Sequence, residues 1–236
     1  MIDIAENLAR VLDRVRAAAR QAGRDPESVQ LVAVAKTQPV EVVREAVAAG
    51  AQIIGENYVQ EARGKIAALG RAVCWHLVGH LQRNKAREAA ELFDLIETVD
   101  SVRLAHALDR VGRERGRPVR VLVEVNTGRE ASKGGVAPEA LPALVESLGP
   151  CEGIEVDGLM TIPPPSADPE AARPFFRLLR QLRDQLASRT PANVHLRELS
   201  MGMSDDFPVA IAEGATIIRV GRAIFGDRAP AGEEAQ

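Results

Sequence analysis

The stretch VQLVAVAKTQPVEVVREAVAAG, residues 29–50, sets the pattern from which the fold can be inferred. Its first half is a short, valine-rich apolar run typical of a buried strand, and Lys36 stands where that strand must end. Pro39 prevents the strand from continuing far, and the residues after it have the spacing of an amphipathic helix. A strand followed directly by a helix is the repeating unit of a parallel sheet.

The same unit recurs along the whole chain. Apolar strand-like runs lie at residues 29–36, 52–57, 73–79, 95–100, 120–127, 154–162, 194–200 and 215–221, with helical patterns between them. An amphipathic helix, with Ile4, Leu8 and Val15 on one face, precedes the first strand. The α/β alternation and the length predict a (β/α)8 TIM barrel with an extra N-terminal helix. An open doubly wound sheet is the alternative. We expect a single domain over residues 1–228 and a disordered tail over 229–236.

Composition excludes several classes of function. The net charge of −3 offers no basic surface for a phosphate backbone, so we expect no nucleic-acid partner. The N-terminal segment carries charges throughout, and no apolar run approaches the roughly 18 residues of a membrane helix. Cys74 and Cys151 are far apart and have no metal-like spacing, which suits free thiols in a reducing compartment. These features predict a cytoplasmic protein with no membrane association.

Polar residues fall at the ends of the expected strands, where barrel enzymes carry their sites. Lys36, Asn57, Ser200 and Gly221 all occupy such positions. A lysine amine at an apolar barrel mouth can act as a nucleophile that forms a Schiff base with a carbonyl. The alternative is a lysine that simply extends into water.

Two segments predict a phosphate pocket after the seventh and eighth strands. In ELSMGMSDDF, residues 198–207, Gly202 permits close backbone approach, and Ser204 precedes a helix. Serine hydroxyls and free helix N–H groups suit an anion, although Ser204 could be a simple N-cap. In IIRVGRAIFG, residues 217–226, Arg219 shares a strand face with Gly221 and should point into the barrel. A structural ion pair is its alternative role.

Three further residues have weaker signals. Asn57 could be a helix N-cap, His76 a structural strand histidine, and Met160 a packing residue. We find no metal-ligand spacing, no Ser/His/Asp arrangement and no GxGxxG motif.

The motifs VAVAKTQP, IGENYVQEA, WHLVGHLQRNK, GLMTI, LSMGMSDDF and RVGRAIFG together resemble the pyridoxal phosphate homeostasis proteins. The resemblance runs from about residue 28 to 228, and six ordered motifs make it specific. These proteins in turn resemble the N-terminal barrel of fold-type III alanine racemases. The resemblance therefore implies a barrel that binds pyridoxal 5'-phosphate (PLP) and maintains intracellular PLP.

The resemblance also implies roles for individual residues. Lys36 would carry PLP covalently as an internal aldimine, and Arg219 would face the pyridine nitrogen. Asn57, His76 and Met160 would contact the cofactor. The phosphate would be held, largely through backbone N–H groups, by Ser200, Gly202, Ser204, Gly221 and Arg222. Many members have Thr or Ser where this chain has Arg222, so a hydroxyl contact is replaced or lost.

The expected site favours holding PLP over turning over a substrate. The Arg219 guanidinium stays protonated, which would keep the ring nitrogen unprotonated and weaken the electron sink of PLP. Related racemases use a second base from another domain, whereas only about 15 residues follow residue 221 here, so we expect no second domain. The only tyrosine, Tyr58, begins a helix.

We therefore expect a monomeric PLP carrier without catalytic residues, with apo-forms of PLP-dependent enzymes as candidate recipients. A minimal PLP-dependent racemase or lyase is the first alternative, favoured if His76 or Tyr58 reaches the opposite face of the cofactor. A PLP-free Schiff-base barrel acting on phosphosugars is the second.

Overall fold

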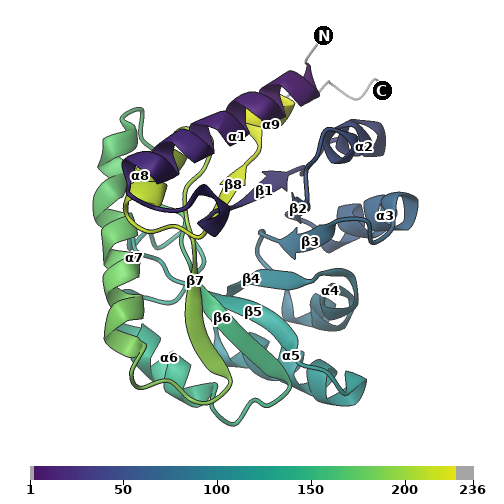
Figure 1. Cartoon of the computed structure of the whole chain (residues 1–236). Helices are drawn as coiled ribbons and strands as arrows, with labels where there is room; N and C mark the ends of the chain where they lie inside the picture. Colours follow the sequence, from purple (N-terminus) through teal and green to yellow (C-terminus); the bar gives the residue numbers. More distant parts are fainter. Residues whose placement is uncertain (1–2, 227–236) are drawn as a thin grey trace.

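Eight parallel strands close into a barrel in the order β1 to β8 in the computed structural model, which describes residues 3–226 (Figure 1). Each strand pairs with the next along the chain, and β8 pairs back onto β1. The closed order confirms the barrel and excludes the open doubly wound sheet. The strands are β1 (Gln30–Val34), β2 (Ile53–Glu56), β3 (Cys74–Leu77), β4 (Leu95–Val99), β5 (Val119–Glu124), β6 (Ile154–Met160), β7 (Val194–Ser200) and β8 (Ile217–Val220).

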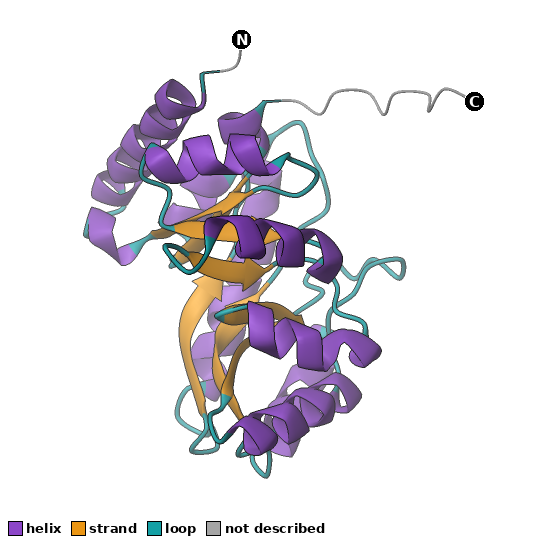
Figure 2. Ribbon diagram, turned by 90° about the vertical axis from the view of Figure 1, so that its right-hand side faces the viewer, coloured by secondary structure: helices purple, strands orange, loops and turns teal. Residues whose placement is uncertain are grey.

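Helices follow the strands and surround the barrel (Figure 2). Seven of them alternate with strands, and the short α9 follows β8. They are α2 (Val40–Ala48), α3 (Val59–Leu69), α4 (Ala86–Leu92), α5 (Val102–Arg115), α6 (Leu141–Ser147), α7 (Arg173–Leu186), α8 (Phe207–Ala212) and α9 (Arg222–Phe225).

The predicted extra helix is present as α1 (Ile4–Gln21). Asp3 caps it, because its carboxylate accepts a hydrogen bond from the Glu6 N–H at 2.9 Å. One face buries Ile4, Leu8, Val11 and Val15, and the helix contacts α8, α9 and α2 (Figure 1). α1 therefore covers apolar surface beside the short helices α8 and α9.

Apolar side chains fill the inside of the barrel as well as its outside. The inner cluster contains Val32, Val78, Leu95, Leu122, Met160 and Ile217. A larger cluster lies between the strands and the outer helices. The inner cluster forms a packed floor, so a ligand can enter only above it, at the carboxyl ends of the strands.

Several expected boundaries need small corrections. β1 ends at Val34 and β2 at Glu56, so Lys36 and Asn57 lie just beyond their strands. The expected tail at 229–236 lies outside the described residues. Within residues 3–226, no helix combines the length and the apolar character needed to cross a membrane. The same residues contain no group of three or more His, Cys, Asp or Glu side chains placed to hold a metal ion.

Replacing each of two helical glycines with alanine should change the free energy of unfolding in opposite directions. A Cβ on buried Gly112, in α5, would lie 1.8 Å from the Gly153 carbonyl oxygen, whereas a Cβ on exposed Gly64, in α3, meets nothing within 4 Å. We expect Gly112→Ala to lower the free energy of unfolding by about 3 kcal/mol through overpacking. Gly64→Ala should raise it by roughly 1 kcal/mol through helix propensity. Urea unfolding of both variants measures the difference, and equal effects would contradict the helix packing described here.

Candidate functional site

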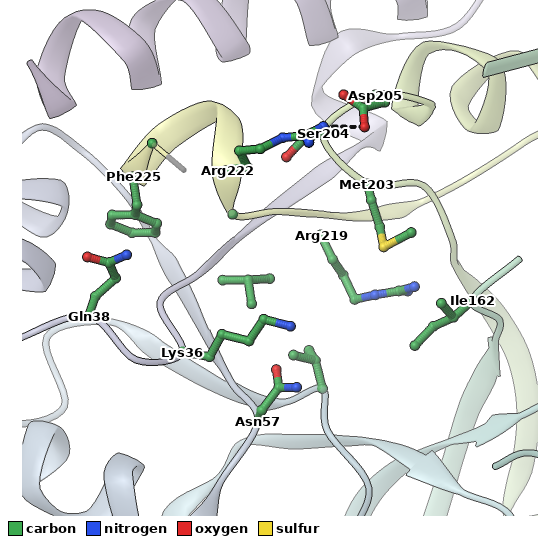
Figure 3. Close-up of a pocket in the computed structure, with 14 residues that line it drawn as sticks. Lys36, Gln38, Asn57, Ile162, Met203, Ser204, Asp205, Arg219, Arg222 and Phe225 are labelled. Carbon is green, nitrogen blue, oxygen red and sulfur yellow. Dashed lines mark hydrogen bonds and ion pairs between the residues drawn. The ribbon is translucent and has the colours of Figure 1, made fainter. Parts of the chain in front are cut away.

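A pocket of about 540 Å³ opens at the carboxyl ends of the strands, beside β8, β1 and β2 (Figure 3). This volume is within the usual range for small-molecule sites. The side chains of Lys36, Asn57 and Arg219 lie around the same space (Figure 3). The full lining is Val34, Lys36, Gln38, Asn57, Val78, Ile162, Met203, Ser204, Asp205, Arg219, Gly221, Arg222, Phe225 and Gly226.

Strand register brings the two central cations of the pocket together. Val32 pairs with Arg219 across the β1–β8 junction. Lys36 follows four residues after Val32 and is half-buried at the mouth. The backbones lie close together at Gly221, because a Cβ there would lie only 3.1 Å from the Val34 carbonyl oxygen. The pocket therefore presents an amine and a guanidinium from adjacent strands, which suits an anionic ligand.

The loops after β7 and β8 are tied to each other. The Ala223 N–H donates to the Ser204 hydroxyl at 3.2 Å, and Arg222 forms an exposed ion pair with Asp205. Gly202 has a φ of 96°, and a Cβ there would lie 2.6 Å from that of Ala210, so only glycine fits without a shift. The two loops therefore form one wall of the pocket.

The N-cap alternatives for Ser204 and Asn57 are wrong. Asp206 is the N-cap residue of α8, and its carboxylate accepts from the Met203 N–H at 2.6 Å. The N-cap of α3 is Tyr58, one residue after Asn57.

A buried polar network holds Arg219 in place beneath the pocket. Its guanidinium donates to the Ser200 hydroxyl at 2.6 Å and to the Thr161 carbonyl at 2.8 Å. Ser200 donates to a Glu97 oxygen at 2.5 Å, and His76 Nδ1 lies 2.8 Å from the other Glu97 oxygen. Arg219 Nη1 lies 3.8 Å from Glu97 Oε2. Arg219 thus lines the pocket and also belongs to an ion pair.

Opposite charges inside the barrel stabilise one another's ionised forms. Burial raises the pKa of Glu97, but the hydrogen bond and charge of His76, the charge of Arg219 and the Ser200 bond outweigh it, so the net pKa is lowered. Burial lowers the pKa of Arg219, and the nearby carboxylates Glu97, Glu124 and Asp206 oppose that shift. A guanidinium remains protonated in proteins. The cation that lines the pocket, Arg219, is therefore paired with a buried, ionised carboxylate outside the lining.

Six of the ten residues predicted for the site line the pocket. They are Lys36, Asn57, Ser204, Arg219, Gly221 and Arg222. The other four lie outside the lining: His76 and Ser200 in the buried network, Met160 in the inner apolar cluster, and Gly202 in the loop after β7, against α8.

Sequence reasoning did not identify several residues of this region. Gln38, Met203 and Asp205 line the pocket, and Glu97 supports Arg219. Glu97 had a detectable signal, because it is a carboxylate inside the apolar run LIETV. Gln38 and Met203 had none, since loop residues gain their neighbours only from the fold.

Comparison with known proteins agrees with this architecture. The family model for the N-terminal domain of alanine racemase matches residues 7–229. A protein of Pseudomonas aeruginosa called pyridoxal phosphate homeostasis protein is 47% identical over 229 residues, 97% of each chain. PipY of Synechococcus elongatus, solved with PLP bound, is 42% identical, with a TM-score of 0.82 over 95% of this chain and 100% of PipY. An alanine racemase of Clostridium difficile shares the fold, at 15% identity and a TM-score of 0.72, covering 96% of this chain and 58% of the racemase.

The Glu97 carboxylate should make folding stability depend on pH. Because its pKa lies below the ordinary 4.5, its contribution is present above that pH and is lost as pH falls below it. Glu97→Gln should lower the free energy of unfolding by roughly 2–3 kcal/mol at pH 7, since Arg219 loses its buried partner. The difference in the free energy of unfolding between Glu97→Gln and the wild type should narrow toward pH 3. Denaturant unfolding across this range measures it, with exposed Glu152→Gln as control; a gap that stays constant would contradict the assignment.

Proposed function

The chain belongs to the family of pyridoxal phosphate homeostasis proteins, and from this premise we propose that it binds PLP in the pocket and helps to maintain the PLP supply without turning over a substrate. The observation that carries the proposal is the meeting of Lys36 and Arg219 in a pocket walled by the loops after β7 and β8. Its relative PipY, with the same barrel, was solved with PLP bound.

The residues present fit each part of PLP. The Lys36 amine would add to the aldehyde carbon, and water would leave as the Schiff base forms. Ser204 and the backbone at Gly221 and Arg222 would hold the phosphate, aided by the charge of Arg222. Arg219 would donate a hydrogen bond to the ring nitrogen.

The same residues disfavour catalysis. PLP supplies an electron-withdrawing ring when bound, and that effect is strongest when the ring nitrogen is protonated. Arg219, kept charged beside Glu97, disfavours that protonation. Neither His76 nor Tyr58 is among the lining residues, and the lining carboxylate Asp205 is paired with Arg222. Among the described residues, the pocket lining thus offers neither of the candidates for the second base that the racemase alternative needs besides Lys36.

We further propose that the protein works in the cytoplasm as a monomer that exchanges PLP with apo-forms of PLP-dependent enzymes. Because Schiff-base formation is reversible, incoming amines at the pocket mouth could displace Lys36 and take up PLP.

PLP should be attached at Lys36. Protein incubated with PLP and reduced with borohydride should carry PLP on the peptide that contains Lys36, because reduction makes the Schiff base permanent. Peptide mass spectrometry locates the attachment. Lys85→Ala, which removes an outer lysine paired with Glu88, is the control and should retain the label. Attachment of PLP to another lysine in the wild-type protein would contradict the assignment.

The PLP-loaded protein should not turn over amino acids. Incubated in deuterated water with each common amino acid in either configuration, it should exchange α-protons far more slowly than ordinary enzymes, whose rates are about 1 per second or faster. NMR follows the exchange, and Lys36→Ala gives the background. Enzyme-like exchange with any one amino acid would favour the racemase or lyase instead.

A further inference from the structure

Two charged side chains of α3 hold the peptide groups on either side of Lys36. Lys65 Nζ donates to the Ala35 carbonyl at 2.7 Å, before Lys36. The Thr37 N–H, after Lys36, donates to a Glu61 carboxylate oxygen at 2.9 Å. Lys65 and Glu61 are one helical turn apart, with 4.0 Å between their charged atoms. Neither Lys65 nor Glu61 is among the residues that line the pocket.

The backbone here needs such support because Thr37 is strained. Its φ is 64°, a left-handed conformation that β-branched residues rarely adopt. Its hydroxyl donates to the Lys36 carbonyl at 2.6 Å, which closes the turn locally. Residues in such conformations persist only when their surroundings hold them there, and they cluster at functional sites. The turn sets the direction in which the Lys36 side chain leaves the backbone.

Lys65 is an unusual residue for a contact whose only role is structural. It is 7% exposed, and it also donates to fully buried Glu56 at 2.7 Å. Burial raises the pKa of Glu56 to about 7, against the opposing hydrogen bond and charge of Lys65. A buried ion pair is weak evidence for stability, because the loss of hydration offsets the attraction. The pair therefore calls for another explanation, and its contact beside Lys36 offers one.

We infer that Lys65 and Glu61 are positioning residues that clamp the Ala35–Thr37 backbone and so aim the Lys36 amine into the pocket at an aldehyde. This inference rests on the proposed function, because the aldehyde is the one that PLP would supply. Without the clamp, the Thr37 turn relaxes to a right-handed or extended conformation, and the amine leaves its place beside Arg219.

The test uses the full-length apo-protein and three variants. Glu61→Ala removes the acceptor of the Thr37 amide. Glu56→Gln combined with Lys65→Met removes the other half of the clamp without leaving a buried charge unpaired. The control is Arg63→Met, which breaks an ion pair between the same helix and Glu88 on α4, away from Lys36.

Three measurements separate positioning from stability. Hydrogen exchange by NMR reports the Thr37 amide, limited reductive methylation with formaldehyde reports the reactivity of Lys36, and spectroscopic titration reports PLP affinity. We expect Glu61→Ala to speed Thr37 exchange at least tenfold, to change the Lys36 labelling rate severalfold, and to weaken PLP binding about tenfold, as for the loss of one charge-assisted hydrogen bond. The double variant should alter labelling and affinity similarly, and Arg63→Met should alter neither.

A rescue variant completes the test. Asparagine tolerates the left-handed conformation far better than threonine. Thr37→Asn in the Glu61→Ala background should therefore restore much of the lost PLP affinity, an effect that a merely structural role for Glu61 would not produce.

Two outcomes are decisive and distinguishable. Faster Thr37 exchange with unchanged Lys36 labelling and PLP affinity would overturn the clamp. Altered Lys36 labelling in the variants, with no PLP binding by the wild-type protein, would support the clamp and remove the proposed function.

Discussion

Parallel pairing of β8 with β1 closes the sheet, and the pocket depends on this junction. The pairing of Val32 with Arg219 brings the start and the end of the chain together, so that the first and last strands supply an amine and a guanidinium to one space. The small residue Gly221 permits the close contact with Val34. An open sheet with the same strands would leave Lys36 and Arg219 at opposite edges, with no shared site.

Burying the charged guanidinium of Arg219 inside the barrel costs free energy, which its contacts with other residues must offset. A buried guanidinium without partners is strongly unfavourable, and here Ser200, Thr161 and Glu97 supply the partners. The same partners fix the direction of the side chain. The network therefore does two things together: it permits the buried charge, and it presents a rigid hydrogen-bond donor that cannot serve as a proton acceptor for the ligand.

Lys36 is controlled in a different way from Arg219. Contacts to its side chain set the direction of Arg219, and hydrogen bonds from α3 hold the two peptide groups beside Lys36. This difference suits their proposed roles. A fixed backbone at Lys36 sets the point from which its amine reaches the ligand, while a fixed side chain at Arg219 sets the direction in which the guanidinium faces.

The sequence by itself determined the alternation of strands and helices and favoured a barrel over an open sheet, because valine-rich runs and amphipathic helices are local properties that can be counted along the chain. It also singled out Lys36, Ser204, Arg219 and Gly221, since strand ends and strand faces follow from the period of two. The inward position predicted for Arg219 is confirmed by its burial and its place in the pocket.

The tertiary structure alone decided which polar groups meet. The Ser200 hydroxyl donates to Glu97, which lies 103 positions away in the chain, and its expected place at the phosphate stays a prediction. His76 contacts the same carboxylate, and its expected contact with the ring likewise stays a prediction. Lys65 and Glu61 had no signal, because a helix pattern does not say which strand end its charged face will reach. Strand and helix preferences are local, whereas a hydrogen-bond partner depends on closure of the whole barrel.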